Sequence, residues 1–140
     1  MIRNVVAVTA GLAVGMIVNM LLTTLNARLL FPMPPDASMS DPEQVNAWVA
    51  TLPVAAFFVV IAAHLGQSFV GGWVAARLGS SRPMMLAMII GTASLAGGIM
   101  AMTSIDGPRW MVVELPLYLV VAWLAGKIEI TRRASIPRLT

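Results

Sequence analysis

The feature that most constrains the fold is an apolar stretch of 26 residues at positions 53–78, PVAAFFVVIAAHLGQSFVGGWVAARL, which carries no charged residue before Arg77. An α-helix rises ~1.5 Å per residue, so this stretch spans the ~30 Å hydrocarbon core of a bilayer with some tilt. The only histidine of the chain, His64, lies near its middle. We therefore predict a membrane-crossing helix with an ionisable side chain close to the bilayer midplane.

Small and polar residues gather on one side of this predicted helix. Gln67 and Ser68 follow His64 at three and four positions, and Gly71 and Gly72 continue the row. Residues at these spacings share a helix face. We expect this face to contact protein or water, and the large apolar residues of the stretch to contact lipid: Phe57, Phe58, Val60, Ile61, Leu65, Phe69 and Trp73.

Three further apolar stretches give a predicted total of four membrane crossings, at about residues 5–31, 53–78, 84–102 and 110–126. The chain of 140 residues is 59% hydrophobic and 11% charged, with a mean hydropathy of +0.86, which is typical of membrane proteins. A secretory signal peptide at the N-terminus is the competing interpretation of the first stretch. Its apolar part exceeds the usual ~7–15 residues, so we favour an uncleaved helix. The predicted fold is one all-α domain, 1–140, an integral membrane four-helix bundle.

Two of the other crossings also carry rows of small residues. Gly11 and Gly15 begin a row that continues every four residues through Asn19, and Gly91 and Gly98 belong to a similar row in the third crossing. Small residues at such spacing let helix backbones approach closely in a membrane. We predict that these glycines, together with Gly71 and Gly72, form the helix-packing faces.

The segment 32–43, PMPPDASMSDPE, is rich in proline and acid and predicts an exposed loop. Ser40 and Glu43 have the spacing of a capping box at the start of a new helix. Apolar residues then recur at helical spacing, which predicts a short amphipathic helix over about 41–52, lying in the membrane interface with Trp48 at headgroup level. Whether this helix is separate from the second crossing is open, because Pro53 is compatible with a new start or with a kink.

The fourth crossing contains Glu114, Pro116 and Tyr118. Pro116 lacks an amide hydrogen, so we expect a bend and a freed carbonyl group one turn earlier. A basic tail, 127–140, follows the crossing. We expect its last part, 130–140, to be disordered and to contact anionic lipid.

Basic residues predict the orientation of the bundle. With four crossings, only Arg28 and Arg109 fall on one side of the membrane. The other side holds Arg3, Arg77, Arg82, Lys127, Arg132, Arg133 and Arg138. The positive-inside rule therefore places both termini in the cytoplasm.

His64 and Glu114 are the first candidates for function, because ionisable side chains are costly inside a bilayer. One interpretation is an ion pair of Glu114 with Arg28 or Arg109, since Glu114 is expected only ~6 Å below the outer boundary. The alternative is that His64 and Glu114 face one cavity at different depths. The candidate polar site would then comprise His64, Gln67, Ser68, Asn19, Glu114 and Tyr118.

The residue types favour no cofactor and no metal site. The chain has no cysteine and one histidine, and its carboxylates are scattered rather than clustered at ligand spacing. Methionine is a soft ligand for copper(I), but it also fills apolar helices, which is the simpler use of 11 methionines. The basic residues follow membrane topology and do not interleave with aromatic residues, so we expect no nucleic acid partner.

The sequence GQSFVGGWVAARL and the closing GPRWMVVELPLYLVVAWLAGKI resemble a group of small four-helix bacterial inner-membrane proteins of no known activity. The resemblance covers about the last two-thirds of the chain. It implies four helices and a bacterial inner membrane, and it brings no activity with it. The matching positions are His64, Gly71, Gly72, Ala75, Arg77, Pro108, Trp110, Glu114, Tyr118, Ala122, Trp123 and Gly126.

Three classes of function stay open at this point. The first, which we favour, is a non-catalytic membrane protein that binds lipid or a partner membrane subunit, because the exposed segments are short. The second is a homo-oligomeric transporter or channel in which His64 and Glu114 handle protons or ions. The third is an intramembrane enzyme with His64 as base.

Overall fold

The computed structural model describes residues 1–136 and consists of helices and loops in that range. The elements are α1 (Ile2–Leu25), its π-helical continuation η1 (Asn26–Leu30), α2 (Pro42–Val49), α3 (Val54–Leu78), α4 (Pro83–Ser104), the 3₁₀ segment η2 (Arg109–Val113) and α5 (Glu114–Ala134). Four helical segments are long and apolar enough to cross a membrane: Ile2–Leu30, Val54–Leu78, Pro83–Ser104 and Arg109–Ala134. The all-α prediction with four spans is confirmed, which indicates a multi-pass membrane protein.

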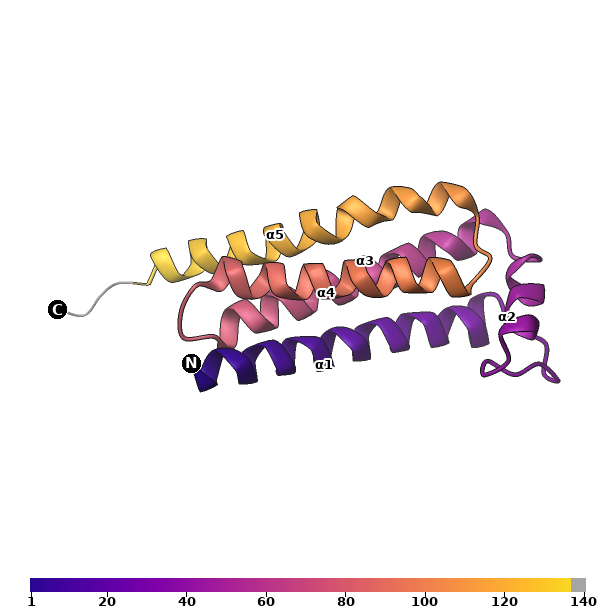
Figure 1. Ribbon diagram of the computed structural model, residues 1–140, viewed down its shortest axis with the longest axis horizontal. Helices are drawn as coiled ribbons and strands as arrows, with labels where there is room; N and C mark the ends of the chain where they lie inside the picture. The colour runs from indigo at the N-terminus through magenta and orange to yellow at the C-terminus, as the bar shows by residue number, and fades with distance from the viewer. Residues whose placement is uncertain (137–140) are drawn as a thin grey trace.

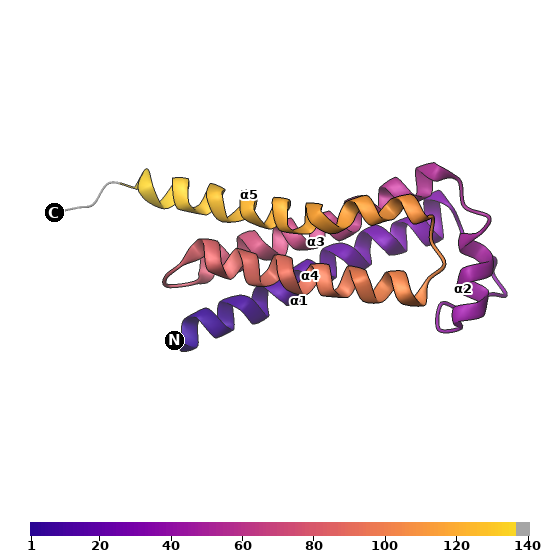
Figure 2. The ribbon, with the colours of Figure 1, turned by 45° about the horizontal axis from the view of Figure 1, so that its top comes forward.

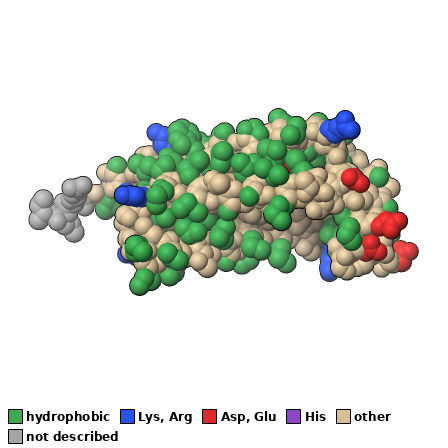
Figure 3. All heavy atoms as spheres, viewed as in Figure 1, with side chains coloured by type: hydrophobic (Ala, Val, Ile, Leu, Met, Phe, Trp, Pro, Cys, Tyr) green, Lys and Arg blue, Asp and Glu red, His purple; other side chains and the backbone are tan. Residues whose placement is uncertain are grey.

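The four long helices run side by side, and α2 lies across one end of the bundle (Figures 1 and 2). Helix α3 packs against α1, α4 and α5, whereas α1 packs chiefly on α3. The N-terminus and the last turn of α5 lie at the end opposite α2. Acidic side chains gather at the α2 end, and apolar side chains cover the sides between the two ends (Figure 3).

Glycine makes the contact between α1 and α3 close. A Cβ atom added to Gly11 would lie 2.5 Å from the carbonyl oxygen of Gly71, and one added to Gly71 would lie 2.6 Å from the carbonyl oxygen of Gly11. At Gly15 the added atom would lie 2.7 Å from the carbonyl oxygen of Gln67. Because these neighbours are backbone atoms, a side chain at any of the three positions would push the helices apart.

The contact between α4 and α5 also uses glycine. A Cβ atom at Gly91 would lie 2.5 Å from the Cβ atom of Ala122, and one at Gly98 would lie 2.7 Å from the hydroxyl oxygen of Tyr118. Gly72 is different, because an added Cβ atom would be 3.5 Å from the carbonyl oxygen of Ala87, an ordinary contact. Gly98 therefore makes room for the Tyr118 ring. At Gly72, by contrast, the close packing of the helices does not depend on the absence of a side chain.

The buried face of α3 is the one that the sequence predicts, since Ser68, Gly71 and Gly72 are buried. Phe58 is 61% exposed, as expected for a lipid-facing residue. The prediction for Phe57 is wrong: it is 6% exposed and packs with Val45, Val49 and Met111. The reason is that α2 folds over the end of the bundle and covers the first turn of α3.

Helix α2 starts at a different cap from the predicted one. The Asp41 carboxylate accepts hydrogen bonds from the backbone amides of Glu43 and Gln44, at 3.0 and 3.5 Å, whereas the Ser40 hydroxyl bonds to the Ser38 hydroxyl at 2.8 Å. The carboxylate is the better N-cap because it also interacts with the positive end of the helix dipole. The helix ends at Val49, before α3 begins, so it is a separate element and shorter than 41–52.

The fourth crossing differs from the prediction at both ends. It begins as 3₁₀ helix, and Pro116 lies in the first turn of α5, where an amide has no intrahelical partner in any case. At the other end the helix continues to Ala134 instead of ending near Gly126, so the prediction of a disordered tail from residue 130 is wrong for 130–134. Residues 137–140 lie outside the described range.

A buried ion cluster explains the longer helix. Glu129 is fully buried and accepts hydrogen bonds from Arg132 at 2.6 and 2.7 Å and from Arg133 at 2.8 Å. Arg133 also donates to the carbonyl oxygens of Ala76 and Gly79, at 2.6 and 2.8 Å. The last turns of α5 thus satisfy free carbonyl groups at the end of α3.

We predict that Gly71→Ala lowers the stability of the bundle by about 1–3 kcal/mol, because the added methyl group meets the α1 backbone. Gly97→Ala is the matched control, since nothing lies within 4 Å of a Cβ atom added there. Thermal unfolding in detergent measures both variants. Equal midpoints for Gly71→Ala and the unmodified protein would show that the α1–α3 contact is looser than described.

Candidate functional site

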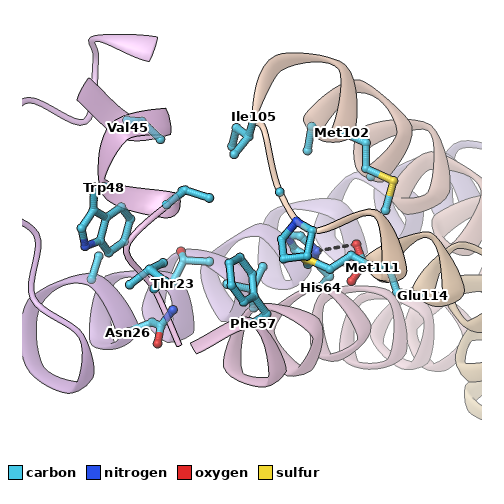
Figure 4. A pocket seen from close by; sticks show the side chains of 18 of the residues that line it. Thr23, Asn26, Val45, Trp48, Phe57, His64, Met102, Ile105, Met111 and Glu114 are labelled. Carbon is cyan, nitrogen blue, oxygen red and sulfur yellow. Dashed lines mark hydrogen bonds and ion pairs between the residues drawn. The ribbon is translucent and has the colours of Figure 1, made fainter. Parts of the chain in front are cut away.

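A cavity of ≈ 330 Å³ lies at the α2 end of the bundle. Its lining comes from α1 with η1, α2, α3, α4 and the start of the fourth crossing, so no single helix forms it (Figure 4). This volume is at the lower end of the ~300–1,000 Å³ that is typical of small-molecule sites. The cavity exists because α2 closes the end of the bundle without filling the space between the long helices.

Most of the lining is apolar. Trp48 and Val49 line it from α2, Phe57 and Val60 from α3, and Met102 from α4. The Trp48 side chain packs on the same cluster of apolar residues that contains Phe57. The other apolar residues of the lining are Ala27, Met39, Val45, Leu52, Ala101, Ile105, Pro108, Met111 and Val112.

The lining also contains the two ionisable residues that the sequence singles out, His64 and Glu114. His64 Nδ1 lies 3.1 Å from Glu114 Oε1 (Figure 4), and the Tyr118 hydroxyl donates to the same oxygen atom at 3.4 Å. The Glu114 side chain is 1% exposed and the His64 side chain 18%. A carboxyl group that is buried in apolar surroundings thus has an imidazole and a phenol as neighbours.

The expected ion pair of Glu114 with Arg28 or Arg109 is wrong. The ion pairs in residues 1–136 join Glu114 to His64 and Glu129 to two arginines. His64 and Glu114 line one cavity, as the alternative expects, and their side chains meet there. Because 3₁₀ helix rises ~2.0 Å per residue, the segment η2 carries Glu114 ~10 Å from its start, deeper than an α-helix would.

Asn26 is a site residue that the sequence analysis missed. It begins the π-helical segment η1, is 2% exposed, lines the cavity, and donates from Nδ2 to the carbonyl oxygen of Ala56 at 3.2 Å. Short π-helical segments are frequent at functional sites. The signal was present in the sequence, because Asn19, Thr23 and Asn26 follow one another at i, i+4 and i+7 on one face.

Asn19 and Gln67 form a second polar group with Ser94, and Ser68 makes a separate hydrogen bond; none of these residues lines the cavity. Asn19 Nδ2 donates to Gln67 Oε1 at 2.6 Å, and Gln67 Nε2 lies 3.5 Å from the Ser94 hydroxyl oxygen. The Ser68 hydroxyl donates to the Tyr118 carbonyl oxygen at 2.8 Å. No side-chain hydrogen bond in residues 1–136 joins this group to the His64–Glu114 pair, so the proton path of the transport hypothesis stays a prediction.

The chemistry that this arrangement offers is binding of a polar group at the inner end of an apolar cavity. No group of three or more His, Asp or Glu side chains in the described range is placed to hold a metal ion. The imidazole and the carboxyl group are hydrogen-bonded to each other, and both residues belong to the lining of the cavity.

No protein-family model, curated protein or solved structure matches this chain. The resemblance to small bacterial inner-membrane proteins therefore stays a prediction, and the interpretation of the site depends on its geometry.

We predict that His64 and Glu114 are energetically coupled. The test is a double-mutant cycle with His64→Leu and Glu114→Leu, in which each single change leaves the other polar group buried without its partner. The double variant should therefore be more stable, by about 1–3 kcal/mol, than the sum of the two single changes in the free energy of unfolding predicts. Unfolding in mixed micelles gives the four free energies.

A second cycle with Glu114→Leu and Arg109→Leu is the control, and its effects should add within ~0.5 kcal/mol. Coupling between Glu114 and Arg109, together with additive effects of His64→Leu and Glu114→Leu, would contradict this pairing and favour an ion pair between Glu114 and Arg109.

Proposed function

We propose that this protein is a non-catalytic, membrane-embedded binding protein for an amphiphile, whose apolar chain occupies the cavity and whose polar group lies at His64 and Glu114. The observation that carries this proposal is the position of the His64–Glu114 pair within the lining of an otherwise mainly apolar cavity. A lining of this kind matches a molecule with a long apolar part and one polar end.

The proposal includes an orientation in a bacterial inner membrane. The acids Asp36, Asp41, Glu43 and Asp106 belong to α2 and to the loops at the cavity end, and Lys and Arg side chains gather toward the opposite end (Figure 3). The positive-inside rule supports cytoplasmic termini and a cavity on the outer side.

Helix α2 then lies in the outer membrane interface. Its Val45 and Val49 side chains are buried toward the bundle, and Glu43 and Gln44 on the other side are exposed. This division of apolar and polar faces supports an interfacial position, with half-buried Trp48 at headgroup level. An amphiphile from the outer leaflet would meet the cavity beside this helix.

Filling the cavity should abolish binding. We predict that the purified protein binds dodecylamine or dodecanol one to one, and that Ala101→Phe weakens this binding about tenfold or more, because the new ring occupies space that the chain needs. Ala101 lines the cavity, whereas Ala96 on the same helix is exposed, so Ala96→Phe is the matched control. Native mass spectrometry counts the bound molecules. If neither compound binds, or if Ala101→Phe binds as well as the control, the proposed function is wrong.

The orientation has its own test, because the chain contains no cysteine. Ser38→Cys, in the loop before α2, and Ser135→Cys, after α5, both lie at exposed positions. A membrane-impermeant maleimide applied to intact spheroplasts should label Ser38→Cys and leave Ser135→Cys unlabelled until the membrane is opened. The reverse pattern would place the cavity on the cytoplasmic side.

A further inference from the structure

Two buried side-chain oxygen atoms in residues 1–136 have no hydrogen-bond partner, and both belong to residues that line the cavity. They are Glu114 Oε2 and Asn26 Oδ1, on side chains that are 1% and 2% exposed. Native proteins leave few buried polar atoms unpaired, because such atoms cost free energy. Their location on one cavity indicates that a bound molecule supplies the missing partners.

The free atom of Asn26 can only accept a hydrogen bond. Its amide nitrogen already donates to the carbonyl oxygen of Ala56 at 3.2 Å, which fixes the orientation of the amide group. The remaining atom is therefore the carbonyl oxygen, which has lone pairs and no proton.

The free atom of Glu114 has the same character. One proton is shared between His64 Nδ1 and Glu114 Oε1, which are 3.1 Å apart. If the carboxyl group is ionised, the imidazole holds this proton and Oε2 has only lone pairs, and if Oε1 holds it, Oε2 is a carbonyl oxygen. In both arrangements Oε2 only accepts, so the two unpaired atoms are acceptors and call for a molecule that donates.

The charges around Glu114 favour a donor that is also a cation. From α3 its neighbour is His64, from α5 Tyr118, and Gly98 of α4 lies behind the Tyr118 ring. Arg109 lines the cavity but is exposed, and no lysine or arginine in residues 1–136 forms an ion pair with the Glu114 carboxyl group. A buried carboxylate is stabilised by a cation that also donates hydrogen bonds to it.

We propose that the polar group of the bound amphiphile is a primary ammonium that donates a hydrogen bond to Glu114 Oε2, with the alkyl chain along the apolar lining. This inference rests on the proposed binding function and specifies the chemical class of its ligand. An alkylamine and an aminophospholipid both carry this group. The unpaired Asn26 oxygen supports the same preference for donors, since both buried unpaired side-chain atoms of the described residues are oxygens.

The test compares three compounds with the same chain and different polar groups: dodecylamine, dodecanol and dodecanoate. Calorimetry on the full-length protein in a nonionic detergent at neutral pH should show dodecylamine binding about tenfold or more tightly than dodecanol, because a hydrogen bond to a charged group is worth that difference. Dodecanoate should bind more weakly than dodecanol, since it brings a second negative charge to Glu114.

Glu114→Gln should remove most of the preference for dodecylamine over dodecanol, whatever its effect on the affinity for dodecanol itself. Glu43→Gln is the matched control, because Glu43 is an exposed acid on α2 near the cavity and its loss should leave the preference unchanged. If Glu114→Gln does not fold, the series of three compounds on the unmodified protein decides.

The outcomes separate the two proposals. Equal affinity for dodecylamine and dodecanol, or a preference that survives Glu114→Gln, would overturn the ammonium assignment and leave amphiphile binding standing. Binding of none of the three would remove the proposed function itself.

Native mass spectra of protein from its own membranes then distinguish the two sources of the ammonium group. Retained phosphatidylethanolamine indicates an aminolipid, and no retained lipid together with dodecylamine binding indicates a free amine. Retention of phosphatidylglycerol alone contradicts the assignment.

Discussion

Backbone contact between α1 and α3 is the constraint on which the rest of the bundle depends. Lipid chains are as apolar as leucine, so helices in a membrane associate through close packing rather than through burial of apolar surface from water. Gly11, Gly15 and Gly71 provide that packing, with carbonyl oxygens where side chains would otherwise be. Once α1 lies on α3 in this register, Asn19 reaches Gln67 and Asn26 reaches the backbone of Ala56. The polar interactions follow from the glycine contact.

The buried Glu114 is costly for a membrane helix, and the fold reduces this cost in two ways. The 3₁₀ start of the fourth crossing moves the carboxyl group inward until it meets His64, and Gly98 leaves space for the Tyr118 ring beside it. An acid near the membrane boundary would have water or arginine as a partner. In the fold it has an imidazole, a phenol and a cavity as neighbours. This arrangement fits a binding site better than an anchoring ion pair.

The two ends of the bundle are stabilised by different chemistry. At the α2 end, apolar side chains such as Phe57 and Val49 pack around an open cavity. At the other end Glu129 and Arg133 join the last turns of α5 to the end of α3 through charged hydrogen bonds. Charged hydrogen bonds thus join the helices at one end of the bundle, and a cavity lies between them at the other.

The sequence by itself determined the four apolar helices, the small-residue face of α3 and the presence of two ionisable residues, His64 and Glu114, within apolar spans, because length, hydropathy and residue spacing are local properties. Only the tertiary structure decided that these two residues pair, that Phe57 is covered by α2, and that α5 continues to Ala134. These outcomes depend on contacts between residues far apart in the chain: His64 and Glu114 are 50 positions apart, and Arg133 and Ala76 are 57. Spacing along one helix does not specify what another helix brings to meet it.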